Sequence, residues 1–151
     1  MKFKFIYIIS LLIFFSCKKD TSYFDSELSQ IKDLIKKENI TPIESDENNG
    51  VFYKLMKDSG TESIHPGKGS YISVQYSIKY INGTTAKSDT KAELYLYEAP
   101  KSWQLILPKM KEKQEMIIIS TSNISYSKKI TDGLNTDKQP LYFYINLLSI
   151  K

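Results

Sequence analysis

Residues 71–80 read Tyr71-Ile-Ser-Val-Gln-Tyr-Ser-Ile-Lys-Tyr80, an alternation of large apolar and polar side chains along the whole stretch. Successive side chains of a β-strand point to opposite faces, so this period of two predicts a strand with one buried and one wet face. Asn82-Gly83 follows, and both positions tolerate positive φ, which is a strong signal for a hairpin turn. The pattern indicates an antiparallel sheet that is covered on one side.

The chain around this hairpin predicts four more strands and one short helix. The helix lies within 102–110, where Trp103, Ile106, Leu107 and Met110 have helical spacing and Pro108 limits the length to a turn or two. The polar stretch 121–139 is long for a structureless connection, and such loops are usually functional. The fold class is α+β, an antiparallel sheet wrapped around one short helix. The four strands are expected at 51–57, 93–97, 116–120 and 141–150.

An amphipathic helix is predicted upstream, over residues 22–38. Its apolar residues recur at steps of three and four, and the positions between them are polar or charged. This stripe packs on the domain, packs on a neighbouring protomer, or binds a partner protein. The segment 43–50 is expected to be a linker. The stripe consists of Phe24, Leu28, Ile31, Leu34 and Ile35.

The amino terminus has the features of an export signal. Lys2 and Lys4 precede an apolar run over 5–15, which is too short to span a bilayer. Ser16-Cys17 follows directly and resembles the lipobox of bacterial lipoproteins, in which the cysteine is diacylated and becomes the first mature residue. We therefore expect a signal peptide over 1–16, a lipidated Cys17 with helix and linker over 17–49, and a globular domain over 50–151. A buried free cysteine after a membrane stub is the alternative.

Composition excludes several function classes. The 151 residues carry a net charge of +4, and all 21 basic residues are Lys. Without the planar fork of Arg, and with so small a charge, sequence-specific nucleic-acid binding is excluded. One Cys and one His rule out a disulfide scaffold and argue against a Cys/His metal site. We expect no metal and no cofactor.

From Gly50 onward, eight short landmarks follow one another along the chain: Gly50–Leu55, Pro66–Gly69, Val74–Tyr76, Asn82-Gly83, Trp103, Met110-Lys111, Ser125-Tyr126 and 140–150. Their order resembles that in the FKBP-type peptidyl-prolyl isomerases. The resemblance covers residues 50–151, and the lipid-anchored form with an added helix is similar to exported isomerases of gliding bacteria, including a motility-associated lipoprotein. It implies an FKBP-like sheet around one short helix, with an amino-terminal helical extension.

The resemblance also implies site residues. Trp103 would form the floor of an aromatic pocket, Tyr76 and Phe143 its walls, and Tyr126 would donate its hydroxyl to the substrate carbonyl. Rotation about an X–Pro bond needs no nucleophile or metal, because the barrier of ~18–20 kcal/mol comes from amide resonance. Four further positions would contact substrate: Ala86, Lys87, Ala99 and Pro100.

Two functions remain open. The first is an isomerase and folding chaperone, anchored by lipid in the bacterial cell envelope, on the periplasmic side or at the outer membrane, with proline-containing exported polypeptides as clients. The second is a catalytically inactive FKBP-like lipoprotein that binds peptides or subunits. Ala86-Lys87 stands where the family has Phe-Asp, which favours the second function, whereas the four retained aromatic residues favour the first.

Overall fold

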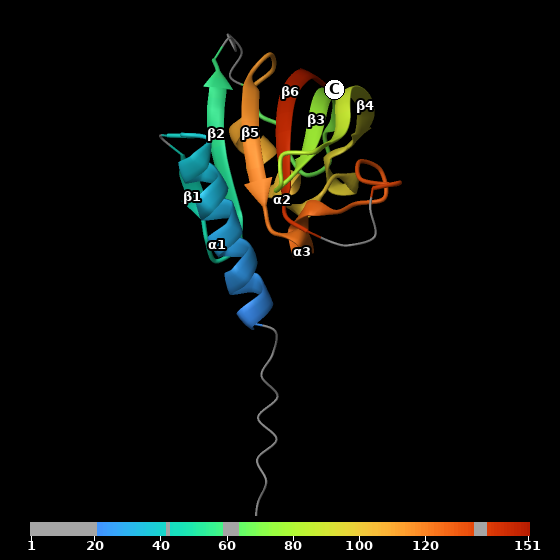
Figure 1. Ribbon diagram of the computed structural model, residues 1–151. Helices are drawn as coiled ribbons and strands as arrows, with labels where there is room; N and C mark the ends of the chain where they lie inside the picture. The colour runs from blue at the N-terminus through green and yellow to red at the C-terminus, as the bar shows by residue number, and fades with distance from the viewer. Residues whose placement is uncertain (1–20, 42, 59–63, 135–138) are drawn as a thin grey trace, which may run out of the picture.

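The computed structural model describes residues 21–41, 43–58, 64–134 and 139–151. The predicted signal peptide 1–16 and Cys17 lie outside the described residues. Six strands form one antiparallel sheet in the order β1-β2-β5-β6-β3-β4 (Figure 1). The strands are β1 (Glu44–Asp46), β2 (Val51–Lys57), β3 (Tyr71–Tyr80), β4 (Thr85–Tyr95), β5 (Glu115–Ser120) and β6 (Leu141–Ile150). The helices are α1 (Thr21–Lys37), α2 (Lys101–Ile106), α3 (Ser122–Ser125) and the 3₁₀ helices η1 (Leu96–Glu98) and η2 (Leu107–Lys109).

The concave face of the sheet holds the main core, with α2 packed inside the curve. Strand β3 shows the predicted alternation, since Ile72, Val74, Tyr76 and Ile78 are buried while the residues between them are partly exposed. The side chains that alternate inward on β6 meet them from the neighbouring strand. An α+β sheet around one short helix, with a helical extension, is therefore confirmed.

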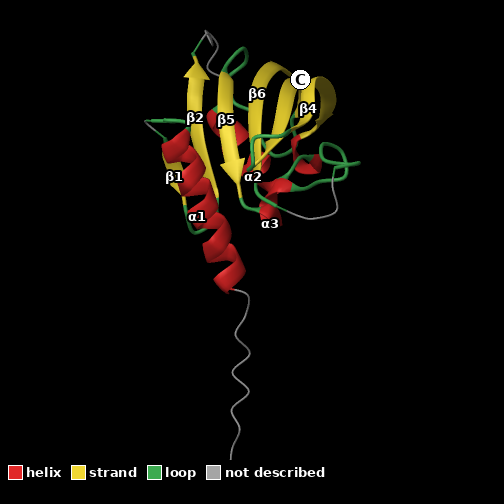
Figure 2. Ribbon diagram, viewed as in Figure 1, coloured by secondary structure: helices red, strands yellow, loops and turns green. Residues whose placement is uncertain are grey.

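Helix α1 covers the outer face of the sheet at the β2–β5 end (Figure 2). Ile31 and Ile35 are buried against Phe52, Ile117 and Ile119. The sheet is therefore covered on both faces at this end, which corrects the expectation of a one-sided sheet. The cause is visible in β5, a continuous apolar run that buries side chains on both faces. Of the alternatives for the helix stripe, packing on the domain is the one observed.

Three local predictions need correction. The strand expected at 93–97 is the end of a longer strand, β4, and residues 96–98 form η1 instead. Pairing with β3 across the hairpin extends β4 through polar residues of low strand propensity, and an edge strand tolerates such residues. The expected linker 43–50 contains β1, which pairs with β2 across a tight turn. The expected loop 121–139 begins with α3.

None of the helices in the described ranges has both the length and the apolar character needed to cross a bilayer.

Candidate functional site

Helix α2 places Trp103 at the centre of the concave face. Pro100 stands at the N-cap, where its carbonyl accepts a hydrogen bond from the Trp103 N–H at 2.9 Å. Pro108 lies in the 3₁₀ turn η2 that follows, where its fixed φ and missing N–H end the α-helix. The helix is therefore confined to two turns, and the Trp103 side chain is 0% exposed.

Two aromatic rings from adjacent strands contact the indole edge to face. The Trp103 and Tyr76 centroids are 5.4 Å apart at 76°, and those of Trp103 and Phe143 are 5.5 Å apart at 84°. Sheet register explains the grouping, since Phe143 pairs with Ile78, two residues along β3 from Tyr76, on the same face. Each such ring pair contributes ~0.5–1.5 kcal/mol beyond area burial. The structure therefore brings three of the four expected pocket residues together.

Tyr126, the fourth expected residue, follows α3 and packs at the margin of the same core. Its hydroxyl donates to the Gln139 carbonyl and accepts from the Gln139 N–H, both at 3.3 Å. Burial raises the pKa of the Tyr126 phenol, and the backbone hydrogen bond partly offsets this. The hydroxyl that was expected to bind a substrate carbonyl is thus engaged with the protein's own backbone.

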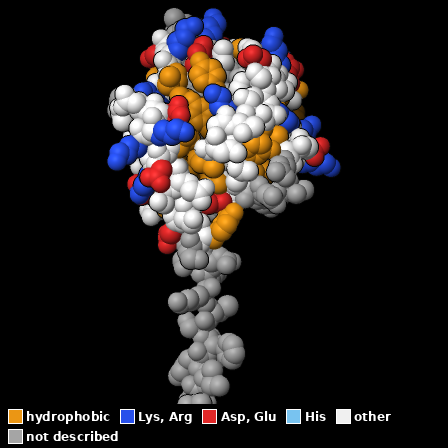
Figure 3. All heavy atoms as spheres, viewed as in Figure 1, with side chains coloured by type: hydrophobic (Ala, Val, Ile, Leu, Met, Phe, Trp, Pro, Cys, Tyr) orange, Lys and Arg blue, Asp and Glu red, His pale blue; other side chains and the backbone are white. Residues whose placement is uncertain are grey.

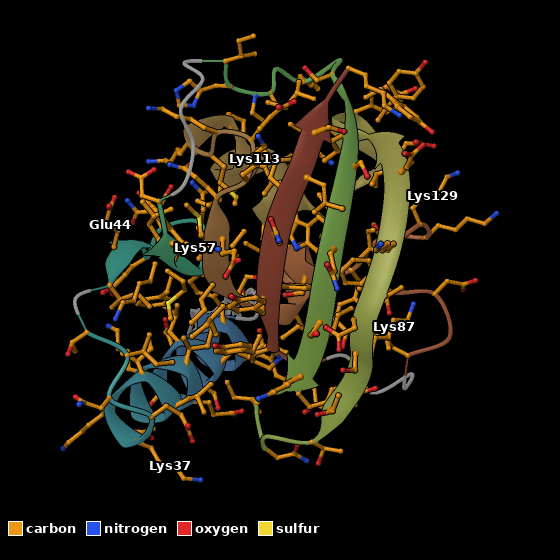
Figure 4. All side chains as sticks on the ribbon, turned by 90° about the horizontal axis from the view of Figure 1, so that it is seen from above. Lys37, Glu44, Lys57, Lys87, Lys113 and Lys129 are labelled. Carbon is orange, nitrogen blue, oxygen red and sulfur yellow. The ribbon has the colours of Figure 1, made fainter. Side chains whose placement is uncertain are left out.

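Lys87 faces the concave side of β4, because it pairs across the sheet with the buried Ile78. Its ammonium donates to the carbonyl oxygen of Ile130 at 2.8 Å, and the Tyr76 hydroxyl donates to the same oxygen over a longer 3.5 Å. Burial also raises the pKa of Tyr76. Figure 4 shows Lys87 beside the loop that carries Lys129.

Ile130 is a residue of this site that sequence reasoning missed. It is 0% exposed and belongs to the same buried cluster as Trp103, Tyr76 and Phe143. Its signal in the sequence is an isoleucine between Lys129 and Thr131, within the stretch 121–139 that we interpreted as a long polar loop.

The remaining expected substrate contacts lie around the same core. Ala99 and Pro100 are buried at the entry to α2, and Ala86 is half-buried against the cluster. The indole N–H of Trp103 is buried and has no hydrogen-bond partner among the described residues. The expected aromatic grouping is thus present, but in this structure it is enclosed.

Of four surface cavities formed by described residues, none has Trp103 or Phe143 in its lining, although Tyr76 contributes to one of ≈ 200 Å³. One of ≈ 390 Å³ lies between the carboxyl end of α1 and the outer sheet face, where Leu34, Ile40 and Tyr142 contribute to its wall. Apolar side chains are visible between charged ones on this side of the molecule (Figure 3). Within the described ranges, no three His, Cys, Asp or Glu side chains are grouped to hold a metal ion.

Solved structures share this arrangement of sheet and helix. FkpA from Escherichia coli superimposes with a TM-score of 0.67 at 16% identity, covering 87% of this chain and 62% of that one. A peptidyl-prolyl cis-trans isomerase from Pseudomonas syringae superimposes with a TM-score of 0.63 at 16% identity, and the match covers 84% of this chain and 95% of that one. The chain has an FKBP-like fold.

Sequence comparison supports a relationship between this FKBP-like chain and the peptidyl-prolyl isomerases. The chain is similar to the peptidyl-prolyl cis-trans isomerase Mip of Coxiella burnetii, with 29% identity over 107 residues. The match covers 68% of this chain and 46% of Mip, so the chain spans about half the length of that relative. No protein-family model matches the chain.

Proposed function

We propose that the protein is an FKBP-type peptidyl-prolyl isomerase of the bacterial cell envelope, held by a lipid on Cys17, that assists exported polypeptides in folding. The observation that carries the proposal is the contact of Trp103 with Tyr76 and Phe143 on the concave face of an FKBP-like sheet. The similarity to Mip and to the Pseudomonas syringae isomerase supports it.

The chemistry suits an aromatic site without nucleophile or metal. A twisted X–Pro amide has lost its resonance and has a less polar carbonyl, so a water-poor aromatic environment stabilises it more than the planar ground state. A preference of about 4 kcal/mol corresponds to roughly a thousandfold in rate. Tyr76 and Lys87 already donate to a carbonyl oxygen at the edge of the cluster, and they are suited to hold a substrate carbonyl in the same way.

The second candidate function is a non-catalytic peptide- or subunit-binding lipoprotein. Two observations favour it. Trp103 is fully enclosed in this structure. In addition, Lys87 places an ammonium where the family resemblance would put a carboxylate.

A protease-coupled or refolding-based isomerase assay on the purified protein separates the two functions. We expect the wild-type protein to catalyse isomerisation above the rate in buffer. Trp103→Leu or Phe143→Leu removes one aromatic ring of the pocket and should lower kcat/KM at least ~10-fold, since this ratio reports lost transition-state stabilisation. Ile119→Ala is the matched control, because Ile119 is equally buried but lies in the outer cluster under α1. Rates equal to buffer for the wild-type protein would leave the binding function alone.

A further inference from the structure

The turn 127–131 is closed by its own hydrogen bonds. The Thr131 N–H and hydroxyl both donate to the Ser127 carbonyl, at 3.0 and 2.8 Å, and the Ser127 N–H donates to the Thr131 hydroxyl at 2.8 Å. Lys128 and Lys129 point into solvent, whereas Ile130 is 0% exposed. The turn is therefore a compact unit that presents one aliphatic side chain to the aromatic cluster.

Ile130 also presents a carbonyl to two donors. Tyr76 on β3 and Lys87 on β4 converge on its oxygen, at 3.5 and 2.8 Å. A peptide bound in the site proposed above would place an aliphatic side chain on the aromatic cluster and the adjacent carbonyl against the two side-chain donors. The chain supplies the same arrangement from its own loop.

Few interactions hold the turn against the sheet. The two hydrogen bonds that link it to the strands, in the part of the chain described, end on the same oxygen of Ile130. The Lys129–Glu98 ion pair at 3.7 Å has the lysine 58% exposed, and such surface pairs contribute little. The turn pairs with no strand. Burial of Ile130 and Thr131 and the two hydrogen bonds to the Ile130 oxygen keep the turn closed. Because none of these contacts belongs to the strand pairing, outward movement of the turn would leave the sheet intact.

We propose that Ile130 is an intramolecular ligand of the Trp103 site, and that client peptides bind by displacing the turn 127–131. This inference rests on the proposed function, because it assigns a regulation to the same site. The protein is then autoinhibited, and its clients are peptides that offer a proline ring or a branched aliphatic side chain together with an adjacent carbonyl. The apparent affinity for such a peptide equals the intrinsic affinity multiplied by the fraction of open molecules.

Trp103 is the sole tryptophan of the chain, so its fluorescence reports on the site without an activity measurement. In the full-length protein, we expect Ile130→Ala to increase acrylamide quenching of Trp103 severalfold, and to strengthen binding of an Ala-Leu-Pro-Phe tetrapeptide on the order of tenfold. Lys87→Met keeps the aliphatic stem and removes the donor to Ile130, so it should increase quenching by a smaller factor. Its peptide affinity does not enter the test, because Lys87 is also proposed to hold the substrate carbonyl. Ile119→Ala, which truncates an equally buried isoleucine of the outer cluster, should leave quenching and peptide affinity unchanged.

The outcomes separate this inference from the catalytic proposal. Greater quenching in both site variants, with tighter peptide binding in Ile130→Ala, supports autoinhibition. This holds even if no variant catalyses isomerisation, in which case only the isomerase function fails. Unchanged quenching in both site variants, or unchanged peptide affinity in Ile130→Ala, would overturn the inference, whatever the catalytic rates. If Ile130→Ala does not fold, Lys87→Met decides alone. An increase in quenching for Ile119→Ala equal to that of the two site variants would also overturn it, because the effect would then be general loosening.

Discussion

Gly50 lies in the β1–β2 turn, against Phe24 of helix α1 and Thr121 at the N-cap of α3. Its φ is +71°, and a Cβ there would lie 2.4 Å from the Thr121 hydroxyl oxygen and 2.8 Å from the Phe24 ring. The Gly50 carbonyl also accepts a hydrogen bond from the Thr121 N–H at 2.9 Å. A side chain at this position would therefore meet both an unfavourable backbone conformation and a steric clash.

Gly50→Ala should lower the free energy of unfolding by at least about 2 kcal/mol, since left-handed backbone in a non-glycine residue alone costs roughly 1–2 kcal/mol. Two alanine substitutions separate the causes. Gly83 has a φ of +89° but open space around it, so Gly83→Ala should show the cost of backbone strain alone. Gly69 has neither a positive φ nor a neighbour within 4 Å of a Cβ, so Gly69→Ala is the control without strain or clash. Urea denaturation measures all three, and equal losses at Gly50 and Gly83 would contradict the importance of the clash.

Tyr144 is a second residue with an unusual environment. Its pKa is raised to about 12, mainly by the hydrogen bond that its phenol donates to Glu115 and secondly by burial. A pKa above that of the unfolded chain means that the interaction stabilises the folded state fully below pH 10. That stabilisation is lost as the pH rises toward 12.

We therefore expect the wild-type protein to lose more stability between pH 8 and pH 11 than the variant Tyr144→Phe, which lacks the ionisable group. Urea denaturation at both pH values gives the comparison. Glu115→Gln should behave like Tyr144→Phe, because it removes the carboxylate that holds the phenol protonated. Identical losses in all three proteins would show that Tyr144 does not contribute to the alkaline transition.

At the scale of elements, helix α1 is an integral part of the fold. Besides its apolar contacts, it contributes Glu27, which is buried and accepts a hydrogen bond from the Ser122 N–H at 2.9 Å. This bond connects α1 to α3, the helix from which the loop with Tyr126 and Ile130 continues. The amino-terminal helix thus contacts both the outer face of the sheet and the segment that leads to the candidate site.

Ile31→Ala should cost about 2–5 kcal/mol of unfolding free energy, the range for truncating a buried aliphatic side chain to alanine. Lys32→Ala, on the exposed face of the same turn, should change it by less than ~1 kcal/mol, since it removes only the solvent-exposed ion pair with Glu47. Chemical denaturation measures both variants. A small loss for Ile31→Ala would mean that α1 is not docked in solution.

For the whole molecule, the docking of α1 limits how far the domain can lie from a lipid on Cys17. Three residues lie between Cys17 and Thr21, the first residue of α1, so the two are four residue steps apart. Extended chain spans at most ~3.6 Å per residue, so the proposed anchor would hold the start of α1 within ~14 Å of the modified cysteine. The proposed lipoprotein therefore keeps its domain close to the membrane surface.

Cys17→Ser should move the protein from the membrane fraction to the soluble fraction, because acyl chains contribute ~0.8 kcal/mol per buried methylene and the serine variant cannot carry them. Fractionation of cells that express the tagged full-length protein measures this. Ser16→Ala retains a small residue before the cysteine and should remain with the membrane. A Cys17→Ser protein that stays membrane-bound would contradict lipidation as the means of attachment.

Local patterns in the chain predicted most of the larger elements. The alternation of 71–80 predicted β3 and its buried face, and the helical spacing of 22–38 predicted α1 to within one residue at each end. Local patterns did not predict β1 or most of β4. Both strands have little strand propensity and form because a turn or hairpin pairs each with a neighbouring strand. Grouping of Trp103, Tyr76 and Phe143 was anticipated only through the family resemblance.

Periodicity is a property of the chain itself, because the geometry of a strand or helix assigns each side chain to a face before any long-range contact forms. Which faces then meet depends on contacts between distant segments. The covering of the outer sheet by α1, the bond from Lys87 to Ile130, 43 residues away, and the burial of one isoleucine in a polar loop all arise in this way. The enclosure of Trp103 is therefore a result of folding that no local pattern contains.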